Sequence, residues 1–186
     1  MRKYVVALCA MALVAAATAG AIGLPGGGGK VDTKKFDELI AQIEEVAANF
    51  EAAKVKVDEC ETALAGIAEK HGIADLFGDP AKITELKDAV TDDDKATLTE
   101  AAEGLTTVPD DLNAAVTKAT ELTTKVPDAL SDLATQITEN PLAAKDLQDK
   151  QSQLEAGKTS LESVTTEAPG LVESATNLGD TIAGLM

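Results

Sequence analysis

The fold is decided by residues 33–71, TKKFDELIAQIEEVAANFEAAKVKVDECETALAGIAEKH. Apolar residues recur in this stretch at steps that alternate three and four, the seven-residue repeat of helices that pack along one seam. Gly72 follows, and glycine is common just past a helix end. The pattern predicts one helix over 33–71, with Asp32 or Thr33 as its cap. The predicted seam consists of Phe36, Leu39, Ile43, Val46, Phe50, Ala53, Val57, Cys60, Leu64 and Ile67.

The residues that flank this seam indicate what covers it. Ile40, Ala47 and Ala68 widen the apolar stripe on one side, whereas a two-stranded coiled coil carries charged residues there. A widened stripe favours contact with two neighbouring helices. We therefore expect a bundle in which the helix packs antiparallel to later helices of the same chain.

The remainder of the chain is divided by capping residues and prolines. Gly78-Asp79-Pro80 and Thr91-Asp92-Asp93-Asp94 each resemble a helix start, which predicts short helices over 80–107. The pattern Val-Pro-Asp-x-Leu occurs at 108–112 and again at 126–130. An apolar stripe crosses both copies, so either one helix over 109–139 is kinked near Pro127 or each proline opens a new helix.

Two further helices are predicted before the end of the chain. Asn140-Pro141 resembles a cap followed by a first turn, which predicts a helix over 141–168. Its stripe includes Gln151 and Lys158, so we expect it to be more exposed. Pro169-Gly170 is expected to separate it from a last helix over 170–186. No segment alternates apolar and polar residues as strands do. The predicted class is all-α: an elongated bundle of coiled-coil-like antiparallel helices, 33–186, with a proline-punctuated C-terminal half and no sheet.

The N-terminus resembles an export signal. Arg2 and Lys3 precede an uncharged, Ala/Val/Leu-rich run that ends in Ala17-Thr18-Ala19, a pattern recognised by signal peptidases. This predicts a signal peptide over 1–19, cleaved after Ala19 or alternatively after Ala21. The other interpretation is an uncleaved membrane anchor that extends to about Leu24. Residues 20–32 contain Gly26-Gly27-Gly28-Gly29 and are expected to form a flexible linker.

Charge and composition exclude several kinds of partner. The chain has 16 basic and 32 acidic residues and a net charge of −16. Because residues 1–19 contain two bases and no acid, their removal changes that charge to −18. Nucleic-acid binding requires neutralisation of phosphates and is not expected, nor is binding to an anionic membrane surface. Few aromatic residues are present, which favours thin helical packing over a thick globular core.

The residues that carry chemistry are few. Cys60 lies on the predicted seam, so it is either a small buried apolar residue or, if the seam faces another copy, an intermolecular disulfide. His71 is interpreted as a helix-end residue near the helix dipole. The acidic clusters lack the spacing of a calcium loop. We expect no catalytic, cofactor-binding or metal-binding residues, and no enzymatic activity.

Two functional hypotheses follow. The first is an exported, non-catalytic structural or protein-interaction protein of the cell envelope, whether periplasmic, envelope-bound or secreted, with a protein partner or self-association. The alternative is a carrier of lipid or another hydrophobic ligand, whose amphipathic helices open to expose their apolar faces.

Overall fold

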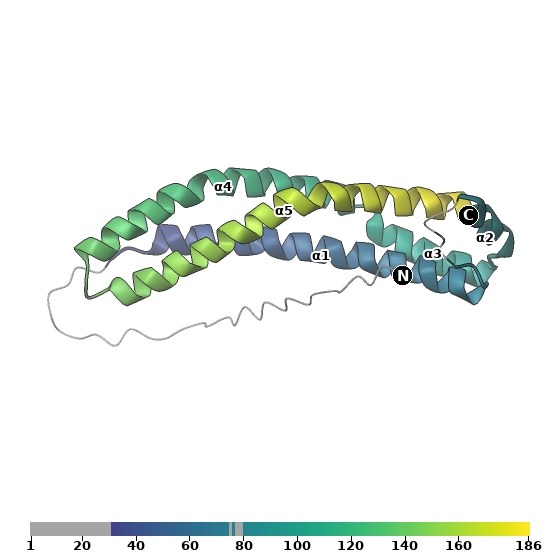
Figure 1. The fold of residues 1–186 in the computed structure, drawn as a ribbon, viewed down its shortest axis with the longest axis horizontal. Helices are drawn as coiled ribbons and strands as arrows, with labels where there is room; N and C mark the ends of the chain where they lie inside the picture. Colours follow the sequence, from purple (N-terminus) through teal and green to yellow (C-terminus); the bar gives the residue numbers. More distant parts are fainter. Residues whose placement is uncertain (1–30, 75, 77–79) are drawn as a thin grey trace.

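The structure, a computed structural model, describes residues 31–74, 76 and 80–186. In that part of the chain it contains helices and no strand, which confirms the predicted all-α bundle (Figure 1). The helices are α1 (Lys34–Lys70), α2 (Pro80–Ala89), α3 (Asp92–Leu105), α4 (Val108–Glu139) and α5 (Ala144–Leu185). The predicted signal peptide, linker residues 20–30 and the predicted cap Asp79 lie outside the described residues.

The helices form a long, narrow bundle (Figure 1). α1 runs the length of the rod, α3 and α4 return along it, and α5 runs forward again, while α2 lies at the far end. α1 packs against α3, α4 and α5, and α4 packs extensively against α5. The expectation of antiparallel packing holds for α3 and α4. It is wrong for α5, which runs parallel to α1 because a second reversal follows α4.

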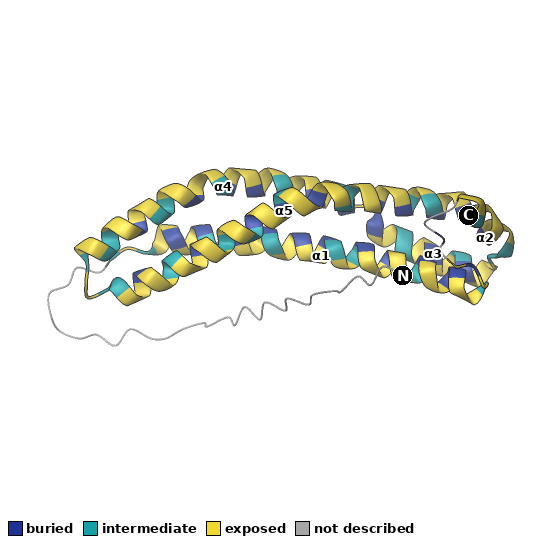
Figure 2. Ribbon diagram, in the orientation of Figure 1, coloured by how far each residue is buried: buried dark blue, intermediate teal, exposed yellow. Residues whose placement is uncertain are grey.

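The core is a single apolar seam along the rod. The ten α1 residues predicted for the seam are all buried, with exposed fractions from 0 to 9 %. Their burial against α3, α4 and α5 shields the stripe within one chain. Exposed residues cover the outward faces of the helices, and buried residues face the axis of the bundle (Figure 2). Burying apolar surface is the main stabilising contribution to such a fold.

The returning leg keeps one heptad register across the junction between α3 and α4. Its buried apolar positions continue at steps of three and four, with half-buried Ala101 and Ala129 filling the two gaps. Thr106 and Thr107 separate the helices without shifting that register. Pro109, at the second position of α4, needs no hydrogen-bond donor there. The buried series consists of Leu98, Leu105, Val108, Leu112, Ala115, Ala119, Leu122, Val126 and Leu133.

The predicted helix boundary at Pro169-Gly170 is wrong. α5 runs without interruption from Ala144 to Leu185 and contains Pro169 in its interior. The proline side chain is exposed, and the buried positions before and after it belong to the same heptad series. One missing backbone donor is therefore outweighed by a seam that stays in register on both sides. That series is Leu147, Leu154, Leu161, Ala168, Ala175 and Ile182.

The structure decides between the two alternatives for Pro127 and corrects the prediction for Pro141. α4 passes through Pro127 as one helix, which confirms the alternative of a single helix over 109–139 (Figure 1). Pro141 does not begin a helix, because residues 141–143 form a turn in which the Ala143 N–H donates to the Asn140 carbonyl at 2.9 Å. Asn140 ends α4 instead of capping α5. The chain must reverse within these few residues, which is incompatible with a helical start at Pro141.

The first half of α5 is better buried than predicted. Leu147, Leu154 and Leu161 are at most 1 % exposed. The seam between them passes through Lys150 and Gly157, so Gln151 and Lys158 lie on its rim rather than on the seam. Lys158 is exposed there and forms an ion pair with Glu162.

Ion pairs between helices fix the same register. Two ion pairs join α1 to α4, one between Lys35 and Asp132 and the other between Lys56 and Asp111. The partners are separated by the same number of residues on both helices, but in opposite chain directions. Asp37 with Lys150, and Lys54 with Glu167, join α1 to α5 with the same number of residues between the partners. These pairs are largely solvent-exposed, so each contributes about 0–1 kcal/mol and acts mainly on the choice of register.

Candidate functional site

The candidate site is a group of hydrogen-bonded polar side chains that lies where α1 ends and α3 begins. α1 ends at Lys70, and Gly72 just beyond it has a φ of +72°, which glycine adopts readily. The Gly72 N–H donates to the Glu69 carbonyl at 2.9 Å, and the Ile73 N–H to the Ala68 carbonyl at 2.9 Å. This double hydrogen bond is a Schellman motif, as the predicted glycine stop implies. It holds Lys70 and His71 at the end of the helix.

α3 begins with a capping box. Thr91 is the N-cap, and its Oγ1 accepts a hydrogen bond from the Asp94 N–H at 3.3 Å. In return the Thr91 N–H donates to Asp94 Oδ2 at 3.0 Å, and the Thr91 hydroxyl donates to the same oxygen at 2.7 Å. Two backbone donors of the first turn are thereby satisfied. The predicted capping cluster at 91–94 is confirmed, with Asp94 as the side chain that reaches back.

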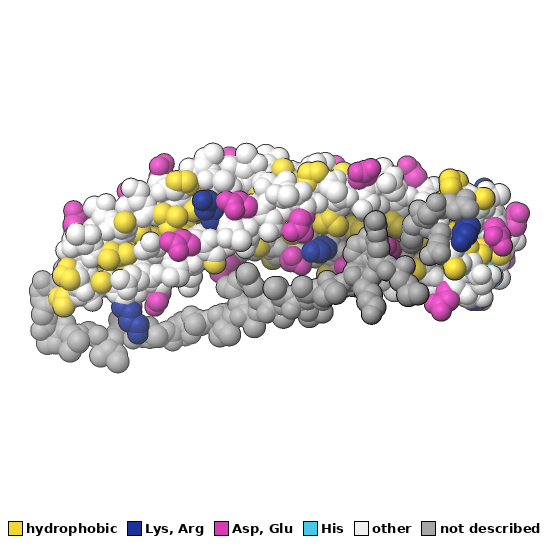
Figure 3. Space-filling model, in the orientation of Figure 1, with side chains coloured by type: hydrophobic (Ala, Val, Ile, Leu, Met, Phe, Trp, Pro, Cys, Tyr) yellow, Lys and Arg dark blue, Asp and Glu magenta, His cyan; other side chains and the backbone are white. Residues whose placement is uncertain are grey.

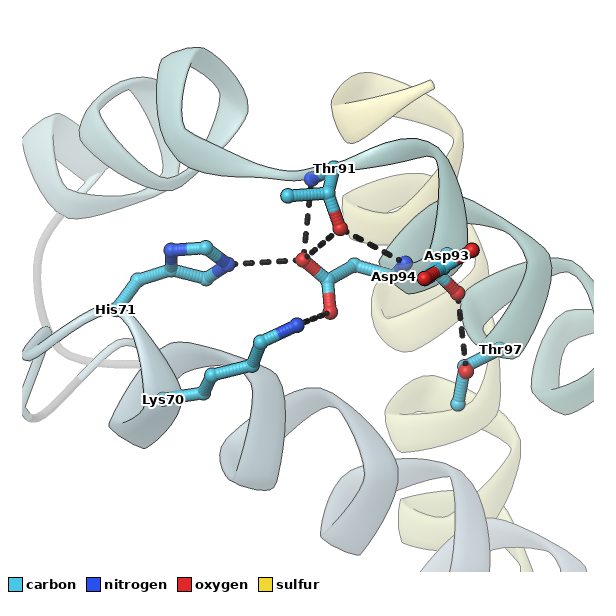
Figure 4. Close-up of polar contacts among 6 residues, drawn as sticks. All are labelled: Lys70, His71, Thr91, Asp93, Asp94 and Thr97. Atoms are coloured by element: carbon cyan, nitrogen blue, oxygen red, sulfur yellow. Dashed lines mark hydrogen bonds and ion pairs between the residues drawn. The ribbon is translucent and has the colours of Figure 1, made fainter.

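Asp94 joins the two helix ends. His71 Nε2 donates to Asp94 Oδ2 at 2.9 Å, and Lys70 Nζ donates to Oδ1 at 2.7 Å (Figure 4). The Asp94 side chain is 5 % exposed, against 17 % for His71 and 55 % for Lys70. Within the described ranges, Asp94 is the one charged residue classed as buried. We call these four residues, Lys70, His71, Thr91 and Asp94, the α1–α3 clamp.

The electrostatics of the clamp favour an ionised carboxylate. The Lys70 hydrogen bond, followed by those from His71 and Thr91, holds the pKa of Asp94 well below its usual range. Burial acts in the opposite direction and is the smaller effect. A buried charge is tolerated when it is paired and hydrogen-bonded, and Asp94 has both kinds of partner.

The hydroxyl group of the clamp bonds to the carboxylate and not to the histidine. A histidine paired with a carboxylate is also found in hydrolytic triads, where the second ring nitrogen activates a nucleophile. Here the Thr91 hydroxyl bonds to Asp94 rather than to His71. The described residues contain no group of three or more His, Cys, Asp or Glu side chains placed to hold a metal ion. The hydrogen bonds of Asp94 to Lys70, His71 and Thr91 join the end of α1 to the start of α3.

Cys60 lies far from any such polar group, within the apolar seam. It is 1 % exposed, it is a free thiol, and burial raises its pKa. The hypothesis of a Cys60 disulfide between copies requires the seam to face a second copy. In the structure the seam of α1 faces α3, α4 and α5 of its own chain. Such a disulfide would therefore require the bundle to open first.

The surface adds one shallow depression on the outer side of α1. It is open to solvent and is lined by Val55, Asp58, Glu59, Thr62 and Ala63, all from the same helix. Val55 is 50 % exposed. Because a single helix supplies the whole lining, the feature is a dent in the surface rather than a cleft between elements.

The contact between the two parts of the clamp is not predicted from the sequence. The local pattern assigns His71 to the helix dipole and Asp92–Asp94 to capping, without a contact between them. One signal was present: Asp94 lies four residues before Leu98 and seven before Ala101, so it continues the apolar stripe of α3 inward. A carboxylate at a core-facing position needs cationic partners. Lys82 and Lys87 lie nearer to Asp94 in sequence than Lys70 and His71 do, so the sequence alone does not select the two partners that the fold supplies.

Comparisons of the chain with protein-family models, with curated proteins and with solved structures find no match. Among the helices of the described residues, none has the length and apolar character needed to cross a membrane.

Proposed function

We propose that this chain is an exported, non-catalytic protein of the cell envelope that acts as a structural rod or binds another protein along its length. The observation that carries the proposal is the closure of the long apolar seams of α1, α4 and α5 upon one another over the whole rod. A bundle closed in this way presents long outer helix faces and a fixed length. At about 1.5 Å per residue, the 42 residues of α5 span about 63 Å.

The polar clamp supports the same proposal. Its carboxylate is saturated by Lys70, His71 and Thr91, which leaves its groups engaged in joining two helices. Export is supported by the sequence of residues 1–24, with its two basic residues, apolar run and small residues at 17–19. The strongly acidic surface supports a soluble rod that avoids nucleic acid and anionic lipid.

The proposal is tested by expressing the chain in bacteria with alkaline phosphatase fused after Met186, since this reporter becomes active only outside the cytoplasm. We expect an active fusion, and a new N-terminus at Gly20 or Ile22 if the signal is cleaved. The control deletes residues 4–16 and is expected to remain inactive in the cytoplasm. An inactive full-length fusion contradicts export.

A second candidate function, a carrier of lipid or another hydrophobic ligand, is favoured by one exposed residue. Leu142 is 88 % exposed in the turn that joins α4 to α5. At the same end Lys150 occupies a seam position, and Gln136 Oε1 is buried without a hydrogen-bond partner, which weakens the core there. This end is where lipid would first enter the bundle. Co-flotation with phosphatidylcholine vesicles that is lost in Leu142→Ser supports the carrier; absence of co-flotation contradicts it.

A further inference from the structure

The ion pairs define which sides of α4 and α5 are turned away from α1. Asp111 and Asp132 of α4 face α1, through Lys56 and Lys35. Glu167 of α5 faces α1 through Lys54. On α4, the flank of the seam that is turned away from α1 therefore meets α5, and the corresponding flank of α5 meets α4. These two flanks continue outward as one solvent-facing surface formed by α4 and α5 together. We call this surface the α4–α5 face.

The α4 side of this face carries no charge over six turns. Val116, Thr123, Leu130 and Ile137 recur one heptad apart and are half-buried. The next column outward consists of Thr120, Pro127 and Ala134, which are exposed and uncharged. Figure 3 shows hydrophobic side chains in a line between α4 and α5 on this side of the molecule.

The α5 side is also poor in charge. Its inner column runs Gln151, Lys158, Thr165 and Val172, all uncharged except Lys158. The outer column adds Glu155 and Glu162. With one base and two acids among these positions, the α4–α5 face is close to neutral in a chain whose net charge is −16.

The outer face of α1 has the opposite character. Five exposed acids and no base occupy its outward columns between residues 44 and 59: Glu44, Glu45, Glu51, Asp58 and Glu59. Two copies of the protein repel each other wherever such faces meet. The α4–α5 face is the side on which a second copy can approach without that repulsion.

We propose that the α4–α5 face pairs with the same face of a second copy in an antiparallel, twofold-symmetric dimer. An isologous interface must be complementary to itself. The ion pairs of α1 with α4 and α5 fix how these two helices are offset along the rod. In that register, the midpoint between Glu155 and Lys158 of α5 lies at the same height along the rod as Thr123 of α4. A twofold axis at that level sets Lys158 of each copy opposite Glu155 of the other.

The same axis pairs the apolar residues of α4. Val116 and Leu130 lie one heptad before and after Thr123, so Val116 of one copy faces Leu130 of the other. Charge and apolar contacts therefore match at a single position of the axis. This pairing rests on the proposed protein-interaction role. It specifies that role, because it identifies the partner as a second copy and the binding surface as the α4–α5 face.

The test measures the mass of the purified protein in solution by sedimentation equilibrium over a range of concentrations. We expect twice the chain mass for the unchanged protein, and at least about a tenfold weaker dimer for Lys158→Glu, because like charges then face each other. The double swap Lys158→Glu with Glu155→Lys restores the opposite-charge pair between copies and is expected to return the dissociation constant to within about threefold. Because residues 155 and 158 lie three apart on α5, the swap also restores an opposite-charge pair within the helix. Urea unfolding of the single and double variants therefore checks that the change in dimer mass is not a change in helix stability.

A matched pair of variants tests the location of the surface. Thr120→Glu and Ala48→Glu add the same charge at exposed positions, the first on the α4–α5 face and the second on the outer face of α1. We expect Thr120→Glu to weaken the dimer and Ala48→Glu to leave it unchanged, with circular dichroism confirming equal helicity. A protein that is monomeric at about 0.1 mM overturns the pairing, as does a dimer that only Ala48→Glu disrupts. A monomer that floats with phosphatidylcholine vesicles assigns the face to lipid instead. None of these results bears on export, which the phosphatase fusion measures.

Discussion

Gly157 of α5 packs directly against Ile43 of α1. A Cβ atom added at Gly157 would lie 2.9 Å from Ile43 Cγ2 and 3.2 Å from Ile43 Cδ1. The first of these is too close for a carbon–carbon contact. Ile43 is 3 % exposed and, as a β-branched residue in a helix, has one strongly preferred rotamer, so it has little freedom to turn away. The glycine is therefore part of the fit between α1 and α5.

We predict that Gly157→Ala destabilises the protein by up to about 2 kcal/mol. Overpacking a core contact costs about 1–3 kcal/mol, whereas replacing glycine by alanine inside a helix contributes about 1 kcal/mol of stability. Gly66→Ala is the control, because nothing lies within 4 Å of a Cβ at this exposed position of α1. It is expected to stabilise by about 0.5–1 kcal/mol. Urea unfolding followed by circular dichroism measures both. An equal gain in the two variants contradicts the close fit.

We predict that Asp94→Asn lowers the free energy of unfolding at neutral pH and makes that free energy less dependent on pH in the acidic range. The pKa of Asp94 is lowered in the folded protein, so the folded state binds fewer protons than the unfolded state. Its contribution is complete above the ordinary aspartate pKa of about 4 and is lost as pH falls through the folded value. The unchanged protein should therefore lose more stability than Asp94→Asn between about pH 5 and pH 2. Urea titrations at several pH values measure this difference.

The control for this prediction is Asp93→Asn. Asp93 is exposed in the same first turn of α3, and its carbonyl, not its side chain, accepts from Thr97. Both substitutions remove one negative charge near the helix N-terminus, so a dipole effect alone would affect them equally. A pH dependence that changes as much in Asp93→Asn as in Asp94→Asn would show that the clamp contributes nothing specific.

We predict that Cys60 is protected from thiol reagents in the folded protein. The side chain is buried and its pKa is raised, so both access and thiolate formation are disfavoured. In a Cys9→Ser background, alkylation by iodoacetamide is expected to be slow in buffer and fast in urea. Mass spectrometry at timed intervals measures the rate. Rapid alkylation in buffer would indicate an accessible seam and would revive the intermolecular disulfide.

The parts of the fold that the sequence predicts well are those governed by a seven-residue repeat. In α1 the apolar steps are uninterrupted, so the helix and its ten buried residues follow from spacing alone. The stop at Gly72 follows from the same logic, because its positive φ favours glycine.

The missed features arise where a local rule competes with a distant contact. A proline is a strong local signal, yet Pro169 lies in a helix because the residues on both sides share one seam. The spacing places Lys158 on the seam, whereas the structure places Gly157 there. Glycine has no apolar side chain by which a sequence pattern could indicate its packing. The clamp joins residues 23 and 24 positions apart, and no local pattern specifies that contact.

We predict that Pro169→Ala stabilises the protein by about 1–3 kcal/mol. An interior proline costs a helix about 3 kcal/mol, because it removes one backbone donor and its ring crowds the preceding turn. The Pro169 side chain is exposed, so its removal opens no cavity. Part of the gain is offset, since proline also restricts the unfolded chain by about 0.4–1 kcal/mol. Thermal and urea unfolding measure the net change.

Pro109→Ala distinguishes the helix-interior effect from a general effect of proline. Pro109 is the second residue of α4, where no intrahelical donor is missing. The main effect of Pro109 on stability is then that it restricts the unfolded chain. We therefore expect Pro109→Ala to be neutral or to destabilise the protein by up to about 1 kcal/mol. Opposite signs in the two variants would establish that α5 maintains a continuous seam at the expense of a hydrogen bond. A loss of stability in Pro169→Ala would instead mean that the proline ring itself makes contacts that hold α5 in place.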